Sequence, residues 1–233
     1  MTQRNIAASP RKTRARRQST RAHLLETAGR VFGQKGFDAA TGKEICQLAG
    51  ANAAAVVYHF GGMDGLYAAV LREARDRLVS TELLAAAVAG ARDPKAKLES
   101  YIAVLVRTLA GPASQSWAAR VIGREIIAPS KAVDQFTDRE LQGRAQILKS
   151  IVSEVTGLAP QHPAVARAAV SILAPCLLLL IVDRRRLGRA FPAFNIRPHS
   201  VRATTRHMTR FALAGLAAIA RKAKRAGTDE SSG

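Results

Sequence analysis

Apolar residues recur at the period of an α-helix along almost the whole chain, and this pattern constrains the fold more than any other feature. Leu24, Leu25, Ala28, Val31 and Phe32 share one face at about 3.6 residues per turn, and similar stripes continue into the C-terminal region. We find no run with the alternation of a β-strand, no hairpin signal and no internal repeat. Prolines near the starts and glycines near the ends of the stripes separate about nine helices. The sequence therefore predicts an all-α protein.

Two very short helices are predicted in the segment "TGKEICQLAGANAAAVVYHF", residues 41–60. Thr41 and Glu44 have the spacing of a capping box, in which the hydroxyl accepts from a backbone N–H and the carboxylate returns to the cap. Gly50 permits a tight turn, and Asn52 can cap the second helix. Small residues at the crossing and a glycine in the turn are what a helix-turn-helix requires. An ordinary αα-hairpin within a bundle has the same spacing and is the alternative.

Positive charge is concentrated at the two ends of the chain. The formal charge is +19, from 36 Lys+Arg and 17 Asp+Glu, which favours an anionic partner such as nucleic acid or an anionic membrane. Residues 1–25 carry seven basic residues and residues 184–225 carry twelve, with no acidic residue in either segment. Residues 23–80 carry six of each sign, so the predicted helix-turn-helix region is neutral.

Four segments follow from these patterns. Residues 1–18 are basic and lack apolar periodicity, which predicts a disordered arm, and residues 226–233 form a polar tail that we also expect to be disordered. Residues 19–65 contain the three helices expected of a helix-turn-helix domain, and residues 66–225 form the larger helical part.

The composition also indicates a compartment. Cys46 and Cys176 lie in apolar surroundings, without the Cys/His clustering of a metal site, and are expected to be reduced core residues. The start of the chain has no apolar stretch of the kind found in a signal peptide. The longest apolar run, "ILAPCLLLLIV" at residues 172–182, is shorter than the about 20 residues needed to cross a bilayer. We therefore expect a cytoplasmic protein with no membrane partner, no metal and no cofactor.

The stretch "TGKEICQLAGANAAAVVYHFGGMDGLYAAVLREA" resembles the N-terminal domain of TetR-family transcriptional repressors. Its Ala-Gly-Ala-Asn, Val-x-Tyr-His-Phe and Gly-Gly elements are similar to those of the CecR-like subfamily. "GREIIAPSKAVDQF" and "HPAVARAAVSI" resemble that subfamily's C-terminal domain, so the resemblance touches most of residues 19–183. It implies an N-terminal three-helix helix-turn-helix DNA-binding domain and a C-terminal helical bundle for ligand binding and dimerisation.

The resemblance also assigns roles within residues 41–60. Thr41 matches a hydroxyl that meets a phosphate, as the exposed N-terminus of a helix also favours. Tyr58 and His59 match phosphate-binding positions at the end of the recognition helix, although they could instead be a packing pair. Asn can read a base edge, and alanine methyl groups can touch thymine methyl groups. The candidate DNA contacts in this segment are Thr41, Lys43, Asn52, Ala53, Ala54, Ala55, Tyr58 and His59.

Two departures from the family pattern remove groups that bind the DNA backbone. Val57 replaces a common Tyr, and Met63 replaces a Lys that usually anchors a phosphate. DNA affinity depends largely on phosphate neutralisation, so cations must come from elsewhere. We hypothesise that Arg14, Arg16 and Arg17 of the arm follow the minor groove or the backbone beside the recognition helix. A solvated tail is the alternative.

For the C-terminal half, the resemblance implies a homodimer through the last two long helices and a small-molecule effector pocket. A two-fold dimer places two recognition helices on successive major grooves, so the double-stranded DNA operator should be palindromic. Core aromatics and a structural Arg/Glu pair are the alternative to ligand contacts. The ligand candidates are Tyr101, Trp117, Arg120, Arg124 and Phe136.

These features favour a sequence-specific regulator, most simply a repressor that an effector releases from its operator. Two other functions compete with it. An enzyme would need clustered acids, bases or nucleophiles, or a phosphate-binding loop, and the sequence has none of these patterns. A nonspecific basic protein that coats DNA or an anionic membrane is the stronger competitor. It predicts weak sequence discrimination and strong salt sensitivity.

Overall fold

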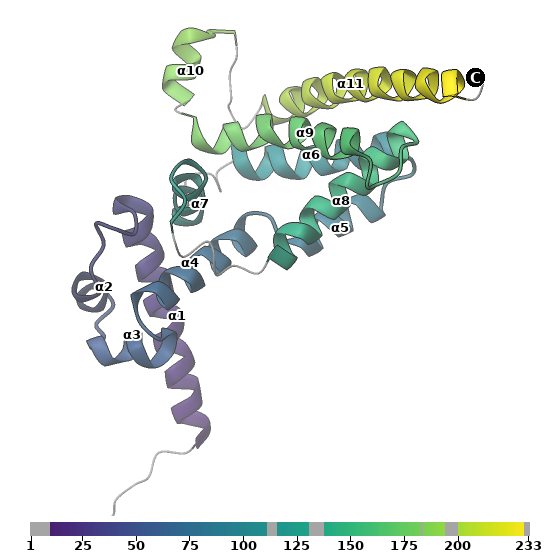
Figure 1. Cartoon of the computed structure of the whole chain (residues 1–233). Coiled ribbons are helices and arrows are strands. Elements are labelled where there is room, and N and C mark those ends of the chain that lie inside the picture. The colour runs from purple at the N-terminus through teal and green to yellow at the C-terminus, as the bar shows by residue number, and fades with distance from the viewer. Residues whose placement is uncertain (1–9, 111–115, 131–137, 183, 194–199, 231–233) are drawn as a thin grey trace, which may run out of the picture. The chain divides into compact units, whose positions relative to one another are not determined.

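The computed structural model describes residues 10–110, 116–130, 138–182, 184–193 and 200–230, and these residues are helical without any strand. The all-α prediction is therefore confirmed (Figure 1). The helices are α1 Pro10–Lys35, α2 Gly42–Leu48, α3 Ala53–Phe60, α4 Met63–Leu78, α5 Thr81–Ala89, α6 Pro94–Ala110, α7 Trp117–Ile127, α8 Asp138–Thr156, α9 Pro163–Ile181, α10 Arg184–Ala190 and α11 Val201–Glu230.

The chain divides into two compact units. The first comprises Met1–Ala74 and Arg120–Phe136, and the second comprises Arg75–Ala119 and Thr137–Gly233. The unit that holds the helix-turn-helix therefore extends beyond the expected boundary at residue 65 and includes most of α7. Both α4 and α7 begin in one unit and end in the other.

Both terminal helices are longer than the sequence patterns predict. α1 begins at Pro10 instead of Ser19, so residues 10–18, expected to be disordered, are helical. Arg, Lys and Gln have high helix propensity, and Pro is well suited to the first turn of a helix. α11 continues to Glu230 and thus includes part of the expected tail. Residues 1–9, which begin the predicted arm, lie outside the described residues.

The first unit is organised around α1 and α4. Leu24, Ala28 and Phe32 of α1 and Leu66 and Val70 of α4 are buried. α1 ends where Gly36 adopts a positive φ of 83°, the left-handed stop that its sequence position predicts.

An aromatic cluster closes this core. The rings of Phe32, Phe37 and Tyr67 form a triangle, with Tyr67 4.8 Å from each phenylalanine and the two phenylalanines 6.0 Å apart. The cluster joins α4 to the end of α1 and to the loop that follows it.

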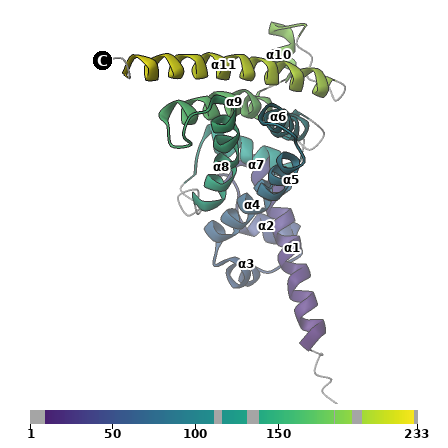
Figure 2. The same cartoon turned by 90° about the vertical axis from the view of Figure 1, so that its right-hand side faces the viewer.

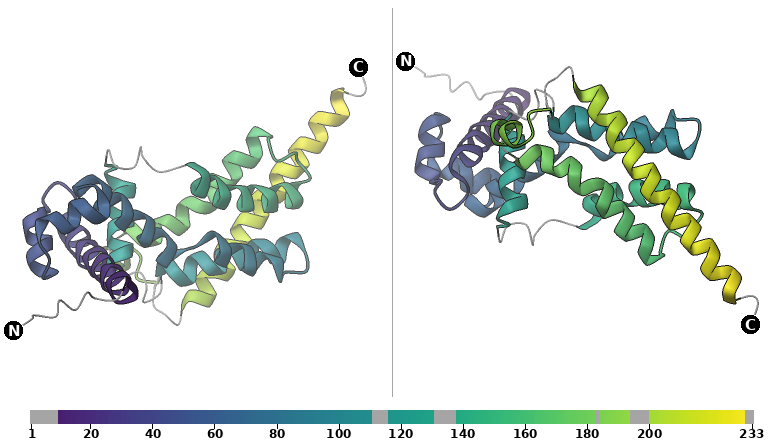
Figure 3. Two further views of the ribbon diagram at one scale, coloured as in Figure 1. Left: turned by 90° about the horizontal axis from the view of Figure 1, so that it is seen from below. Right: turned by 90° about the horizontal axis from the view of Figure 1, so that it is seen from above.

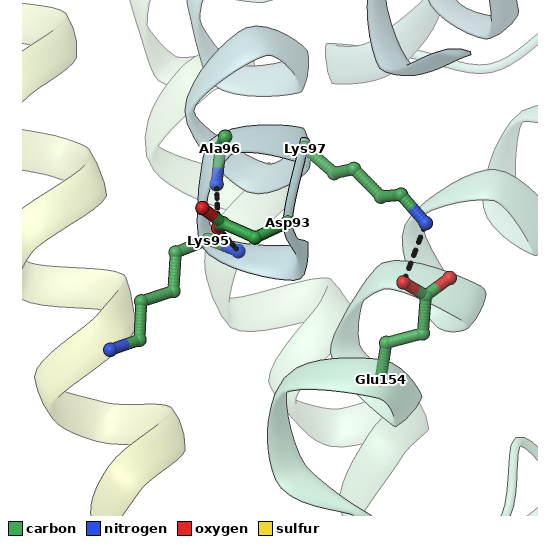
Figure 4. A network of polar contacts seen from close by, with 5 residues as sticks. All are labelled: Asp93, Lys95, Ala96, Lys97 and Glu154. Carbon is green, nitrogen blue, oxygen red and sulfur yellow. Dashed lines mark hydrogen bonds and ion pairs between the residues drawn. The ribbon is translucent and has the colours of Figure 1, made fainter. Parts of the chain in front are cut away.

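The second unit is built on α6, which packs against α5, α8, α9 and α11. Asp93 begins α6 as predicted, because its Oδ1 accepts from the N–H groups of Lys95 and Ala96, each at 2.9 Å (Figure 4). At the surface, Nζ of Lys97 lies 2.7 Å from Oε2 of Glu154 on α8 (Figure 4). α11 lies alongside α9 when seen from above (Figure 3).

α9 contains the apolar run that we considered too short to cross a bilayer. The helix has 19 residues, and an 18-residue window of it has a mean hydropathy of 2.3, so by length and composition it could span a membrane. Counting the bent pair Ala53–Phe60 and Met63–Ala89 as one span would give a second candidate. Core helices of soluble proteins meet the same criterion of length and composition.

Candidate nucleic-acid interface

Thr41 caps α2 with its side chain. Its Oγ1 accepts from the N–H of Glu44 at 3.2 Å, which is half of the predicted capping box. The carboxylate of Glu44 pairs with Lys35 instead, with 2.6 Å between Oε1 and Nζ. The predicted return bond to the cap is therefore replaced by an ion pair that ties α2 to the end of α1. The hydroxyl hydrogen of the exposed Thr41 can still be donated to a phosphate.

The turn between α2 and α3 is closed by backbone bonds and small residues. Gly50 has a positive φ of 57°, and the N–H of Ala51 donates to the carbonyl of Cys46 at 2.9 Å. The buried thiol of Cys46 points to the carbonyl of Asn52, with 3.6 Å between Sγ and the oxygen. Ile45 and Val56 are buried beneath the turn, with exposures of 0% and 5%. This is the helix-turn-helix packing that the sequence predicts.

Asn52 is the N-cap of α3, and this fixes what it can read. Its Oδ1 accepts from the N–H of Ala55 at 2.9 Å, so the amide oxygen bonds to the helix. Bidentate recognition of adenine needs both the amide oxygen and the amide NH₂. The NH₂ group of Asn52 remains available to a base edge, while one of the two lone pairs of its oxygen is used by the helix. Ala53 and Ala54 are exposed beside it, and Ala55 is half-buried.

The end of α3 carries an exposed polar and aromatic surface. Tyr58 is 65% exposed, and its ring meets that of His59 edge to face at 4.9 Å. Phe60 is half-buried, and the guanidinium of Arg21 lies 5.1 Å from the centre of its ring. A basic residue of α1 therefore lies beside the end of the predicted recognition helix, where the negative end of the helix dipole favours a cation.

Met63, which replaces the Lys expected from the family pattern, packs on α2. A Cβ built on Gly42 would lie 3.4 Å from its Sδ. The thioether thus covers the first turn of α2 without contributing charge.

The cations within the helix-turn-helix region are largely paired with acids. Arg30 pairs with Glu26 at 3.2 Å, and Lys35 pairs with Glu44. Lys43 is exposed on α2. Arg14, Arg16 and Arg17 add positive charge to the N-terminal part of α1, whose helical backbone extends past α3 (Figure 2).

The four ligand candidates that the structure describes are divided between the two units. Tyr101 and Trp117 are buried in the second unit, and the guanidinium of Arg77 lies 4.9 Å from the centre of the Trp117 ring. Burial raises the pKa of Tyr101 to about 12. Arg120 and Arg124 belong to the first unit, and Phe136 lies outside the described residues.

Arg124 contacts the end of α1. Its Nε and Nη2 donate to the carbonyls of Gly33 and Gln34 at 3.3 and 2.7 Å. These bonds satisfy carbonyls that the end of a helix leaves without partners, so Arg124 acts as a cap of α1.

The second unit contains a cavity that the sequence analysis missed. It has a volume of about 810 Å³ and lies between α9 and α11. A periodic stripe on α11 could have indicated it, because lining residues recur there every three or four positions. The apolar residues that line it from the two long helices include Ile172, Pro175, Leu179, Met208, Phe211 and Leu216.

Comparisons with known proteins match two successive segments of the chain. Residues 24–70 match the family described as "Bacterial regulatory proteins, tetR family". Residues 94–216, more than half of the chain, match "HTH-type transcriptional dual regulator CecR, C-terminal domain". No curated protein matches the sequence at a significant level.

Several solved structures share the fold. A putative transcriptional regulator from Pseudomonas aeruginosa PAO1 has 20% identity and a TM-score of 0.66, covering 90% of this chain and 97% of its own. FadR from Bacillus subtilis, solved with stearoyl-CoA, has 16% identity and a TM-score of 0.63, covering 83% and 98%. AibR, solved with isovaleryl coenzyme A and operator DNA, has 17% identity and a TM-score of 0.62, covering 82% and 96%.

Proposed function

Because the chain belongs to the TetR family of bacterial regulatory proteins and has a CecR-type C-terminal domain, we propose that it represses transcription by binding a palindromic operator and leaves it when a small effector binds. The observation that carries this proposal is the short α2–α3 pair, with its buried crossing and its exposed Asn52, Ala53 and Ala54. We propose that α3 enters the major groove, with Thr41, Tyr58 and His59 on phosphates. Such a protein acts in the cytoplasm.

The cations for phosphate binding come from α1. The acids that pair with Arg30 and Lys35 cancel much of the positive charge of the helix-turn-helix. Arg21 already lies beside the end of α3, and Arg14, Arg16 and Arg17 are two or fewer helical turns further toward the N-terminus. This segment therefore acts as a helical extension that follows the DNA backbone, in place of the disordered arm expected from the sequence.

The partner of the second unit is another copy of the chain. Val170 and Leu178 on α9 and Phe211 on α11 are 66%, 48% and 77% exposed, which is costly for a monomer in water. The cavity between these helices lies next to them, lined mostly by apolar side chains. A two-fold contact through α9 and α11 covers this surface and pairs two recognition helices.

The effector site lies in the second unit. Of the five candidates, Tyr101 and Trp117 belong to this unit and combine apolar area with a polar atom. Two relatives of the same fold were solved with acyl-CoA molecules, so this class of compound is the first to test. An effector must bind the DNA-incompetent state more tightly, because equal affinity for both states shifts no equilibrium.

A selection from random duplexes tests the function. We expect recovery of one palindrome, bound at least about 10³-fold more tightly than random DNA at the same salt concentration. Titrating that complex with isovaleryl-CoA and stearoyl-CoA then tests release. Binding without sequence preference and with a steep salt dependence would instead indicate a nonspecific coating protein, and equal binding to anionic vesicles would indicate a membrane surface.

A further inference from the structure

Two consecutive residues of α7, Arg124 and Glu125, bind two different helices of the first unit. Arg124 donates to the last carbonyls of α1, at Gly33 and Gln34. Glu125 is 7% exposed, and its Oε2 accepts from the hydroxyl of Tyr67 on α4 at 2.6 Å. These contacts bridge sequence separations of 91 and 58 residues.

Both oxygens of the Glu125 carboxylate accept hydrogen bonds. Its Oε1 accepts from the N–H of Ser130 at 2.6 Å and from the hydroxyl of Ser130 at 3.0 Å. A buried carboxylate is tolerated when it accepts several hydrogen bonds, and removing one of its partners is costly. Burial raises the pKa of Tyr67, and the bond to Glu125 raises it further, so this hydroxyl remains a donor. The Tyr67 hydroxyl is therefore the donor of this bond, and the Glu125 carboxylate is the acceptor.

The Tyr67–Glu125 contact joins α7 to α4, and α1 and α4 are the helices that contact α2 and α3. The ring of Tyr67 packs against those of Phe32 and Phe37, and α1 continues from there to the Lys35–Glu44 ion pair with α2. Two residues before Tyr67, α4 meets the end of α3 at Gly65, where a Cβ would lie 1.8 Å from the carbonyl oxygen of Phe60. A shift of α4 relative to α1 therefore moves α3 relative to α2.

We propose that Arg124 and Glu125 are positioning residues for DNA binding, which fix α1 and α4 to α7 and thereby hold the recognition helix in its operator-binding orientation. This inference rests on the proposed function.

The test uses the full chain and the selected operator. Tyr67→Phe and Glu125→Leu each lower operator affinity by about tenfold, because each leaves buried groups without a partner. Glu125→Gln retains most of the affinity, since its amide can accept from Ser130 and donate to the Tyr67 oxygen. Combining Tyr67→Phe with Glu125→Leu costs little more than the worse single change, because both remove the same bond.

Arg124 and the matched control residues are tested in the same way, by substitution and measurement of operator affinity. Arg124→Ala lowers operator affinity by about tenfold. The exposed Lys97–Glu154 pair supplies matched controls (Figure 4), since Glu154→Leu and Lys97→Ala make the same charge changes on the second unit. Both controls should stay within about twofold of the wild type.

Two readouts separate positioning from general stability. Stoichiometric titration with operator should give the same active fraction for every variant. Amide hydrogen exchange of the free protein should quicken over residues 52–61 in Tyr67→Phe and Glu125→Leu, but not in Glu154→Leu. Unchanged affinity in Tyr67→Phe, additive effects, or a loss explained by the active fraction overturns the proposal. A wild-type chain that selects no operator defeats the proposed function, while the exchange measurement still decides the positioning role.

Discussion

Gly65 shows how closely a single position can be constrained. Its missing side chain lets the first turn of α4 approach the backbone of Phe60, where any Cβ would lie 1.8 Å from the carbonyl oxygen. In the sequence it is one of several glycines near Gly61 and Gly62, which end α3 with positive φ angles. The reason for Gly65 is steric, and it depends on a neighbour that only the folded chain supplies.

Gly65→Ala should therefore destabilise the first unit. Relieving the overlap requires the backbone to move, which costs at least about 2 kcal/mol in the free energy of unfolding. The matched control is Gly143→Ala in α8, where a Cβ would meet Thr81 Cγ2 at 3.8 Å, an ordinary contact. Urea unfolding of both variants checks this expectation, and equal stabilities would contradict it.

Asn52 has two roles that substitution can separate. Asn52→Ala removes the cap of α3 and should cost about 1 kcal/mol of stability. Asn52→Ser keeps an acceptor for the N–H of Ala55 but loses the amide NH₂, so stability should be retained while one base pair per half-site loses about 1–3 kcal/mol of discrimination. Competition with operators altered at each position measures this. Full discrimination by Asn52→Ser would make Asn52 a cap only.

At the scale of elements, α1 and α5 show where local signals succeed and fail. Ser80 caps α5, and its Oγ accepts from the N–H of Leu83 at 3.1 Å, a signal that is readable in the sequence. The apolar periodicity does not indicate α5, because its apolar stripe is weak and Leu84 is the only residue of this helix that is buried. α1 was predicted too short for the opposite reason, since its first turns have helix propensity without any apolar stripe.

The extension of α1 should supply the salt dependence of DNA binding. Changing Arg14, Arg16 and Arg17 to Gln retains helix propensity and removes three charges, so operator affinity falls and the slope of log K against log salt flattens by up to about 2.7. Changing Arg221, Lys222 and Arg225 on α11 to Gln removes the same charge elsewhere. Binding isotherms at several salt concentrations compare the two, and identical slopes would show that the extension does not meet DNA.

At the scale of the whole molecule, the apolar surface of α9 and α11 determines what the second unit can join. Its cavity and exposed side chains come from helices whose apolar stripes face outward as well as inward. Periodicity predicts which residues share a face of one helix. It does not predict which faces remain uncovered once four helices have packed around α6.

Phe211→Glu should convert the protein to monomers. A charge buried in an apolar contact without a partner is strongly unfavourable, and separated subunits bind the two half-sites independently and more weakly. Phe191 is also exposed, at 61%, but does not line the cavity, so Phe191→Glu is the matched control and should remain dimeric. Sedimentation velocity with operator titration checks both variants. A dimeric Phe211→Glu protein would contradict the predicted interface.

The sequence by itself determined the helical class, the helix-turn-helix and most helix ends, because these depend on residues within about four positions of each other. Asn52, Asp93 and Gly36 perform the local roles expected of them. The tertiary structure decided the partners of charged and polar side chains: Glu44 pairs with Lys35, and Arg124 binds the end of α1. These partners are 9 and 90 residues apart in the chain, and a long side chain binds whichever unsatisfied group the packing places within its reach.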